Sequence, residues 1–465
     1  MAREKLGSRL GFILLSAGCA IGCGNVWKFP TMCGSSGGAG FVLVYIACLV
    51  LLGLPIMTME FSIGRAAQKS PIKMYQQLEK PKSKWHIHGY LSLLGNFALM
   101  AFYTVVTGWM IYYFVRFAVG NNLSELIYIP GKTAGASDIQ NPFVDMLSNI
   151  KINFIYTGIA IFIGFLVLCF KLQGGLERVT KYLMIALLFL LIGLAVYSIS
   201  LDGAGEGLKF YLVPEFSKIN GKVVVAAMNQ AFFTLSLGIG SMAIFGSYID
   251  KERSLLGESV NIILLDTFVA LTAGLIIFPA CFTYNNGNVD GGPGLLFNTM
   301  STVFNKFNNQ NVGRIFGMLF FLFMVFAAMS TVLAVCENIV AMVRDLTNWG
   351  RPLACIVCGL VVAICAALSI LGNTVWSSFN PLHTGNIFNF WDFIVSTNLL
   401  PLGSLCYVIF CSTKFGWGWD NFVAEANSGK GLKVKNWMRL YIKYVIPAII
   451  IFLYIYGLIN YEWVK

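Results

Sequence analysis

Charged side chains are scarce in this chain. Only 11% of its 465 residues are Asp, Glu, Lys or Arg, and 57% are hydrophobic, whereas an ordinary soluble domain has about 25% charged residues. So little polar surface excludes a soluble globular protein. The net charge of +11 does not indicate disorder or nucleic-acid binding, because the basic residues are scattered between long apolar runs. These runs are continuous and about 20 residues long or more, which favours a polytopic helical membrane protein over a β-barrel.

The apolar runs predict eleven membrane spans. They are residues 11–37, 40–66, 89–117, 152–171, 176–200, 224–248, 256–283, 312–343, 353–371, 387–411 and 441–460. With the N-terminus in the cytoplasm, the cytoplasmic segments carry most of the 32 Lys and Arg residues, as the positive-inside rule requires. We therefore expect a multi-pass protein of the cell (inner) membrane with a cytoplasmic N-terminus. Because the number of spans is odd, the C-terminal segment is expected outside.

Residues typical of enzymes and metal sites are also few. The chain has three histidines, and no P-loop or H-E-x-x-H motif is present. Residues 34–38 match G-x-S-x-G, but no strand precedes them, so a nucleophile elbow is not expected. Almost all of the twelve cysteines lie in apolar runs, which favours packing; Cys355-x-x-Cys358 has no second pair nearby to suggest a metal. The apolar stretch beginning at Gly11 lacks a signal-peptide cleavage site. An enzyme is not predicted.

Two predicted spans contain a Gly-x-Gly pair near their middle, with polar side chains close by. The first reads Gly-Cys-Gly-Asn at residues 22–25, and the sixth reads Ser-Leu-Gly-Ile-Gly at residues 236–240. Glycine lets a helix unwind, and unwound backbone at that depth must be covered by protein or hold a polar ligand. The first and sixth positions are equivalent in two inverted repeats of five helices. Close helix packing is the alternative use of these glycines.

Ionisable residues within the apolar spans are further functional candidates, because burying charge in a membrane is costly. They are Glu60, Asp266, Glu337 and Asp392. Glu60 has a second interpretation, as a carboxylate that satisfies unwound backbone. The hydroxyls of Ser330 and Thr331 either bind a ligand or donate to the carbonyl one turn earlier.

Two predicted outer loops are long, at residues 118–151 and 284–311. The second combines glycine-rich and short apolar pieces. Composition alone leaves two alternatives open for it: a lid that dips over a cavity, or a solvated connector.

The motifs around the two Gly-x-Gly pairs are specific enough to resemble a known family. Five segments carry the resemblance: residues 9–12 with 22–30, residues 37–41, residues 53–55 with 60–61, residues 230–238, and residues 393–403 ending Asn-Leu-Leu-Pro-Leu-Gly. Together they are similar to the neurotransmitter:sodium symporter family, in its bacterial amino-acid branch, over nearly the whole chain. Inverted repeats and broken helices are typical of this family.

The resemblance implies an all-α polytopic membrane protein with the LeuT-type five-plus-five inverted-repeat fold. It implies one transporter domain, residues 1–465, with eleven transmembrane helices, of which helices 1 and 6 are unwound at mid-membrane. The first repeat would be residues 9–200, the inverted second repeat residues 223–411, and the last helix residues 441–460.

The implied activity is sodium-coupled uptake of an amino acid by alternating access, with two sodium sites. The first would use Ala20, Asn25, Thr234, Asp266 and the substrate carboxylate. The second would use carbonyls of Gly18, Ile21 and Ala327 with the hydroxyls of Ser330 and Thr331. All these ligands are oxygens, as a hard cation requires.

The implied substrate site mixes main-chain groups with an apolar pocket. Its residues would be Cys19, Ala20, Gly22, Cys23, Gly24, Leu99, Tyr103, Phe233, Thr234, Ser236, Ile239, Thr331, Val332 and Val335. Gly22 stands where amine-transporting relatives carry an aspartate, which favours a substrate that brings its own carboxylate. Ile239 and Val335 are smaller than their counterparts in a bacterial relative, whereas Leu99 is larger. We expect a large hydrophobic or aromatic amino acid.

Asp266 and Ala270 indicate whether transport requires chloride. Animal relatives bind chloride beside the first sodium site, with an asparagine and, four residues later, a serine at these positions. The Asp266 carboxylate would supply the negative charge here. The resemblance therefore implies sodium ions as cofactors and transport that does not need chloride.

Two charged pairs would gate access to the site. Lys28 and Asp392 would form the outer pair, with Lys28 in place of the usual arginine. On the cytoplasmic side, Arg3 would pair with Asp345 near Tyr248. Leu6 replaces a tryptophan found in many relatives. The expected partners are the amino acid, sodium and membrane lipid, and no nucleic acid. A transporter-like receptor without turnover and a sodium-independent or proton-coupled exchanger remain the alternative functions.

Overall fold

The computed structural model describes residues 6–120, 123–127, 141–170, 172–284, 294–307, 309–461 and 463–464. The secondary structure of these residues is helical, and their only β contact is an isolated bridge between Arg253 and Lys430. The all-helical class predicted from the sequence is confirmed for this part of the chain.

Nine helical runs in the described residues are long and apolar enough to cross a membrane. Five of them are single helices: α6 (His86–Val119), α8 (Ile150–Leu168), α13 (Leu255–Tyr284), α15 (Gln310–Thr347) and α16 (Arg351–Asn373). Three consist of two helices joined by a π-helical turn: Ala39–Ala67 with α3 (Ala39–Cys48) and α4 (Leu54–Ala67), Ile387–Ser412 with α17 (Ile387–Asp392) and α18 (Leu400–Ser412), and Met438–Ile459 with α20 (Met438–Leu440) and α21 (Ile446–Ile459). The ninth, Gln173–Ile199, is a π-helical turn followed by α9 (Arg178–Ile199). Each lies within a few residues of a predicted span.

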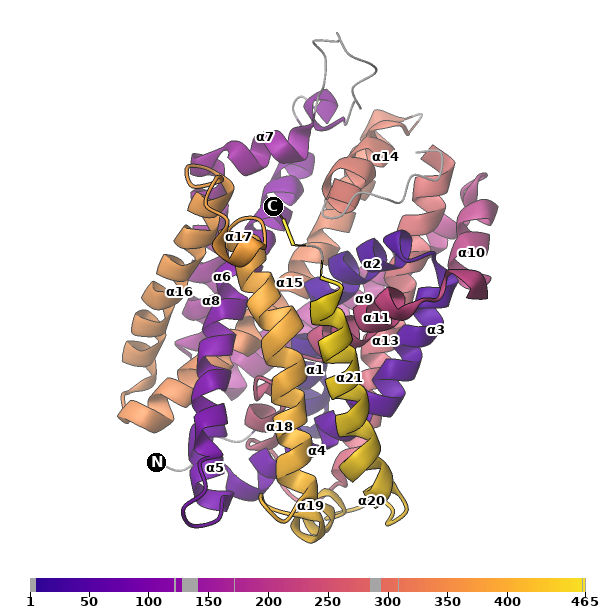
Figure 1. Cartoon of the computed structure of the whole chain (residues 1–465). Coiled ribbons are helices and arrows are strands. Elements are labelled where there is room, and N and C mark those ends of the chain that lie inside the picture. Colours follow the sequence, from indigo (N-terminus) through magenta and orange to yellow (C-terminus); the bar gives the residue numbers. More distant parts are fainter. Residues whose placement is uncertain are drawn as a thin grey trace.

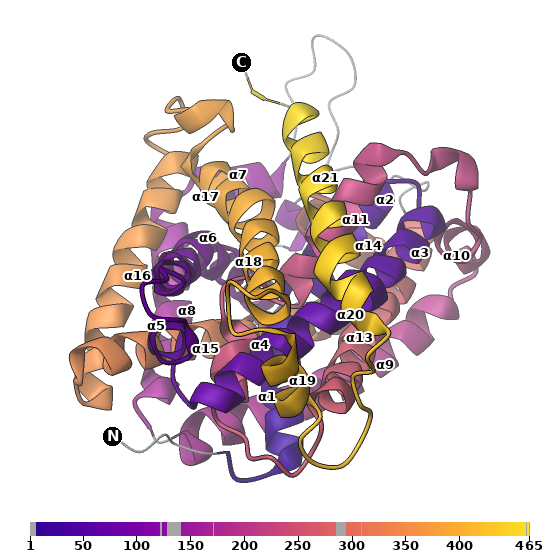
Figure 2. The same cartoon turned by 60° about the horizontal axis from the view of Figure 1, so that its bottom comes forward.

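The long helices run between two ends of one bundle (Figure 1). The lower end in that view carries α5 (Pro71–Leu78), α19 (Trp419–Ala426) and α20. The upper end carries α2 (Phe29–Ser35), α7 (Pro142–Ser148), α10 (Ala204–Leu212), α14 (Ser301–Asn305) and α17. A second view places α16 and α10 at opposite edges of the bundle (Figure 2).

Local sequence signals set many helix ends. Asparagine side chains accept hydrogen bonds from first-turn amides: Asn149 from Ile152, Asn220 from Val223 and Asn386 from Asn389. Such caps satisfy amides that have no partner inside the helix. Gly120, with φ of 74°, ends α6 in the left-handed conformation that glycine adopts without strain.

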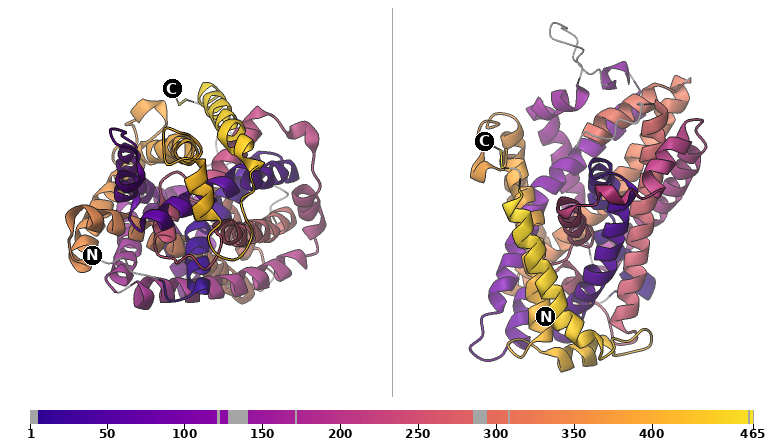
Figure 3. Two further views of the ribbon diagram at one scale, coloured as in Figure 1. Left: turned by 90° about the horizontal axis from the view of Figure 1, so that it is seen from below. Right: turned by 45° about the vertical axis from the view of Figure 1, so that its right-hand side comes forward.

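Burial separates an inner group of helices from an outer group. In α1 (Arg9–Ala20) nine of twelve residues are buried, and in α12 (Ser241–Gly246) all six are. In contrast, α8, α9 and α21 expose large apolar side chains such as Phe162, Phe189 and Phe452. Apolar exposure on the perimeter is what contact with lipid requires. The views from below and from the side show the helices gathered into one bundle (Figure 3).

Two inner helices are interrupted. The chain turns after α1 and continues as a π-helical turn, Gly24–Lys28, and α2; the two parts are bent by 47° and would add a tenth span. The second interruption is residues 235–240, between α11 (Gly221–Thr234) and α12. There Ser236, Gly238 and Gly240 have positive φ values of 49°, 88° and 78°. Both interruptions fall in the Gly-x-Gly segments. The count of eleven spans and the position of the breaks at mid-membrane stay predictions.

The second long loop is only partly described, since residues 285–293 and 308 lie outside the described ranges. Its described part is a helical turn, Leu295–Met300, followed by α14. Phe297, Met300 and Val303 are almost completely buried. This part of the loop is therefore packed into the protein, and it is no solvated connector.

Candidate functional site

A small cavity lies between the two helix interruptions. Its volume is about 10 Å³, and it is lined by Cys19, Ala20, Gly24, Leu99, Tyr103, Phe233, Ser236, Ile239, Thr331 and Leu400. Nine of these residues belong to the predicted substrate site. Leu400, at the start of α18, is the exception, although it belongs to the segment 393–403 that carries part of the family resemblance. Val332 and Val335 are buried on α15, but neither lines this cavity.

The first interruption leaves main-chain groups without helical partners. The amide of Cys23 donates to the Tyr103 hydroxyl at 2.7 Å, and the amide of Gly22 donates to Asn25 Oδ1 at 3.3 Å. A Cβ atom at Gly22 would lie 2.1 Å from both the Tyr103 hydroxyl and Thr331 Oγ1. A larger residue would therefore require the backbone or these hydroxyls to shift, because real Cβ atoms do not approach so closely.

A first group of oxygen atoms meets beside the interruption of α1. Thr234 Oγ1 lies 2.9 Å from Asn25 Oδ1 and 3.1 Å from Asp266 Oδ1. The Asn25 amide donates to Asp266 Oδ1 at 2.8 Å, and the Tyr45 hydroxyl lies 3.4 Å from Asp266 Oδ2. All four side chains are buried, so the carboxylate is held by polar contacts in an otherwise apolar core.

A second group of oxygen atoms joins α1 to α15. Ser330 Oγ donates to the carbonyls of Ala327, at 2.8 Å, and Ile21, at 3.2 Å. Thr331 Oγ1 donates to the carbonyls of Gly18, at 3.1 Å, and Cys19, at 3.3 Å. These hydroxyls therefore reach across to another helix. An all-oxygen group of this kind suits a hard monovalent cation.

Glu60 bonds to the second interruption. Its Oε1 accepts the amide of Gly238 at 2.6 Å, and the carboxylate is completely buried on α4. Of the two interpretations of Glu60, this contact supports the one in which it satisfies unwound backbone.

Lys28 and Asp392 meet close to the cavity. Lys28 Nζ lies 2.8 Å from Asp392 Oδ1 and 4.0 Å from the centroid of the Phe233 ring, which lines the cavity. The pair is direct and joins the helical turn before α2 to the end of α17.

The family comparisons agree with one another. The sequence model of the sodium:neurotransmitter symporter family matches residues 3–124 and 139–465. The chain is 33% identical over 460 residues to the sodium-dependent transporter YhdH of Bacillus subtilis, covering 98% of both chains. It is 31% identical over 465 residues to a sodium-dependent transporter of Haemophilus influenzae, again covering 98% of both. The chain belongs to the sodium:neurotransmitter symporter family.

A solved structure extends this finding to the fold. The crystal structure of MhsT in complex with L-phenylalanine superimposes with a TM-score of 0.86 and 33% identity, over 98% of this chain and 99% of that one. This sodium:neurotransmitter symporter therefore has the LeuT-type fold. Family and fold make it a sodium-dependent, multi-pass membrane transporter rather than an enzyme.

At the lower end of the symporter, the predicted gate residues have several partners. The Tyr248 hydroxyl donates to Glu337 Oε1 at 2.8 Å, and Arg351 pairs with Glu337 Oε2 at 2.5 Å. Asp345 Oδ2 accepts the amide of Ser70 at 2.8 Å. Arg3 lies outside the described residues, so its predicted pairing with Asp345 stays a prediction. Glu337 is one of the functional candidates predicted from the sequence, but its ion pair with Arg351 was not predicted.

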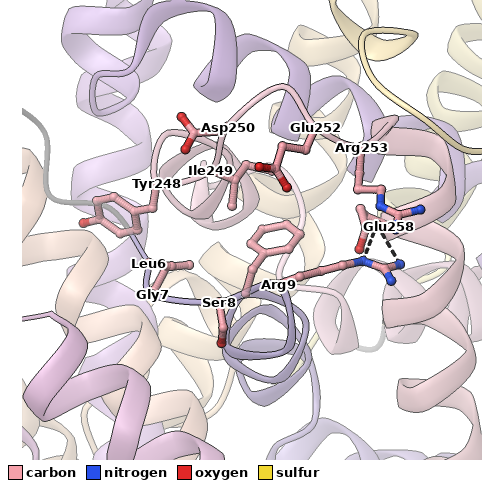
Figure 4. Close-up of a pocket in the computed structure, with 11 residues that line it drawn as sticks. Leu6, Gly7, Ser8, Arg9, Tyr248, Ile249, Asp250, Glu252, Arg253 and Glu258 are labelled. Carbon is pink, nitrogen blue, oxygen red and sulfur yellow. Dashed lines mark hydrogen bonds and ion pairs between the residues drawn. The ribbon is translucent and has the colours of Figure 1, made fainter.

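The segment before α1 is fixed to the symporter by contacts that the sequence did not reveal. The amide of Gly7 donates to Glu177 at 2.8 Å, and that of Leu6 to the Tyr248 carbonyl at 3.2 Å. Arg9 pairs with Glu258 at 2.9 Å, beside a pocket of about 200 Å³ between this segment and residues 248–253 (Figure 4). A main-chain hydrogen bond thus holds Leu6 against the segment at Tyr248.

Proposed function

We propose that this protein couples sodium entry to the uptake of an amino acid by alternating access. One observation carries the proposal: two groups of oxygen atoms lie beside one cavity, at the place where two interrupted helices meet. The sodium-dependent transporters among its relatives support sodium as the driving ion. MhsT, with bound L-phenylalanine, supports an amino acid as substrate.

The two oxygen groups are the proposed sodium sites. Asn25, Thr234, Asp266 and the Ala20 carbonyl would bind one ion together with the substrate carboxylate. The carbonyls of Gly18, Ile21 and Ala327 would bind the other, with Ser330 and Thr331. Direct contact between the first ion and the substrate carboxylate would couple them, because each then raises the affinity for the other by the same factor.

The proposed substrate is a large hydrophobic or aromatic amino acid. Leu99, Phe233, Ile239 and Leu400 provide apolar walls for its side chain. A cavity of about 10 Å³ holds no amino acid, so these walls must move apart when the substrate enters. Gly22 offers no carboxylate to an amine. The substrate carboxylate would compete with the Tyr103 hydroxyl for the Cys23 amide.

Chloride independence follows from the same site. The buried Asp266 carboxylate would supply the negative charge beside the first sodium ion, and the buried Ala270 offers no hydroxyl to an anion. Uptake should therefore persist when chloride is replaced by gluconate.

The proposed architecture has eleven spans, counting α1 with α2 and α11 with α12 as one span each. Residues 9–200 and 223–411 would be the inverted repeats and residues 441–460 the last span. The lower end would face the cytoplasm. Lys28 and Asp392 would then close the outer side, Arg3, Asp345 and Tyr248 the inner side, and residues 294–307 would cover the outer mouth.

The test uses the purified protein in detergent and in proteoliposomes. Thermal unfolding with each of the twenty amino acids, in sodium and in potassium, identifies a ligand because binding to the folded state raises the melting temperature. We expect stabilisation by apolar or aromatic amino acids in sodium only. Radiolabelled uptake driven by a sodium gradient should follow. Sodium-dependent binding without uptake would indicate a receptor, and uptake in potassium would indicate an exchanger; either result would reject the proposal.

A further inference from the structure

The pair formed by Lys28 and Asp392 includes a third side chain, Ser396. Lys28 Nζ donates to Ser396 Oγ at 2.9 Å, and Ser396 Oγ donates to Asp392 Oδ1 at 2.6 Å. Lys28 Nζ donates to the same Oδ1 at 2.8 Å. The three groups therefore form a closed triangle of hydrogen bonds.

The triangle uses the serine hydroxyl both as an acceptor and as a donor. A hydroxyl has one hydrogen to donate and lone pairs to accept with; here it accepts from the ammonium and donates to the carboxylate. The Ser396 residue is 5% exposed, whereas the Asp392 side chain is 37% exposed and that of Lys28 13%. Ser396 thus lies on the protein side of the pair, where water cannot fully replace a hydrogen bond that is lost.

The chemistry of lysine explains why a third group is needed. An arginine at this position could give a carboxylate two parallel N–H donors from its planar fork, whereas lysine is a compact point charge. With Ser396, Asp392 receives a second hydrogen bond from a donor on its own helical run. Lys28 is also fixed over the Phe233 ring at 4.0 Å, so the triangle is connected directly to a wall of the cavity.

We propose that Ser396 is a positioning residue of the outer gate: it completes the Lys28–Asp392 pair and thereby slows release of the substrate toward the outside. This inference rests on the proposed function, in which the pair closes the outer side. Ser396 can hold the pair together only while Lys28 is present, so its effect on binding should depend on the residue at position 28.

The experiment compares Ser396→Ala with Ser396→Thr and with Ser404→Ala. Ser404 is a fully buried serine further along the same helical run, and no hydrogen bond to its hydroxyl occurs in the described residues. Binding and dissociation of radiolabelled L-phenylalanine are measured in sodium. We expect Ser396→Ala to weaken binding by about 3- to 10-fold, as loss of a hydrogen bond to a partly exposed charged pair should, mainly through faster dissociation. Ser396→Thr should restore wild-type values, and Ser404→Ala should change them less than about twofold.

Lys28→Arg provides the second arm. Because the guanidinium brings its own second donor, Ser396→Ala in the Lys28→Arg background should weaken binding less than about twofold. An equal loss in both backgrounds, or a loss no larger than that of Ser404→Ala, would overturn the inference.

A third arm needs no substrate. Thermal unfolding is measured for wild type, Lys28→Met, Ser396→Ala and the double variant. Ser396→Ala should lower the melting temperature of wild type more than that of Lys28→Met, in which only the bond from Ser396 to Asp392 is left to lose. Additive effects would contradict the triangle. If wild type binds no L-phenylalanine in sodium, the proposed substrate class fails, and this cycle still decides whether Ser396 acts through Lys28.

Discussion

Asn25 and Asp266 are 241 residues apart in the sequence, and their side chains meet at 2.8 Å, from Asn25 Nδ2 to Asp266 Oδ1. The same amide nitrogen also donates to the main-chain carbonyl of Asp266 at 3.0 Å. Asn25 Oδ1, on its other side, accepts from Thr234 at 2.9 Å. One asparagine therefore ties the turn after α1 to both α13 and the end of α11.

This relationship makes Asp266 the most informative residue to change. Asp266→Asn keeps the size of the side chain and removes its charge. We expect the sodium concentration for half-maximal uptake to rise about tenfold or more, equivalent to about 1.4 kcal/mol or more, because a buried cation loses an anionic ligand. Uptake against sodium concentration measures the effect, and Asp420→Asn, at an exposed position on α19, is the control.

Chloride dependence can be tested in the Asp266→Asn variant. Adding Ala270→Ser to Asp266→Asn introduces a hydroxyl one helical turn away and should make uptake depend on chloride. Wild type should keep its rate in gluconate. A wild-type rate that falls severely in gluconate would show that the Asp266 carboxylate does not take the place of chloride.

The hydroxyls that join α15 to α1 give a second prediction. Thr331→Val and Ser330→Ala remove oxygens that contact the carbonyls of Gly18 and Ile21. Each change should raise the sodium requirement of uptake about tenfold. Thr272→Val removes a hydroxyl whose one hydrogen bond among the described residues is to the Phe268 carbonyl of its own helix, and it should leave the sodium requirement unchanged. If the variants of Ser330 and Thr331 kept the wild-type uptake rate at every sodium concentration, these hydroxyls would not bind sodium, as a proton-coupled or sodium-independent exchanger predicts.

Much of the fold could be predicted from the sequence because its signals are local. The lengths of the apolar runs predicted the positions of the long helices. The glycines at 22, 24, 238 and 240 fall in or beside the two interruptions. A Gly-x-Gly pair acts on the backbone within a few residues, so no knowledge of distant partners is needed to anticipate its effect.

The contacts between distant residues could not be predicted in the same way. Glu60 bonds to Gly238, 178 residues away, and Ser396 bonds to Lys28, 368 residues away. Leu400 reaches the cavity, whereas Val332 and Val335 do not line it. These outcomes depend on how the helices rotate against one another, and helices that are apolar on nearly every side carry little periodic signal of that rotation.

Gly22 provides a steric prediction. Gly22→Ala would bring a methyl group within 2.1 Å of both Tyr103 and Thr331, so either the backbone or both hydroxyls must shift. We expect uptake to fall at least about tenfold, since misplacement of binding groups by about 1 Å can cost about 100-fold. Gly158→Ala, on α8, would meet no atom within 4 Å and is the control. Equal uptake by the two variants, at equal amounts of folded protein, would contradict the geometry.

The lower end of the bundle gives a prediction about stability. Arg65, at the end of α4, is almost completely buried; its Nε lies 2.7 Å from Glu425 Oε1 on α19, and its Nη1 donates to the carbonyl of Arg253 at 2.7 Å. Glu425 Oε2 also pairs with Lys251 at 2.8 Å, but the Lys251 side chain is 62% exposed. One carboxylate thus joins a buried cation to a solvated one.

Removing the charge of Glu425 therefore differs from removing that of Lys251. Glu425→Gln leaves the buried guanidinium without a counter-charge, and breaking a buried pair costs about 3–5 kcal/mol. Lys251→Gln removes a solvated partner, which costs about 0–1 kcal/mol. Thermal unfolding in detergent should show a clearly lower melting temperature for Glu425→Gln and almost no change for Lys251→Gln. Similar melting temperatures for the two variants would mean that water reaches Arg65, and that α19 does not hold α4 through this pair.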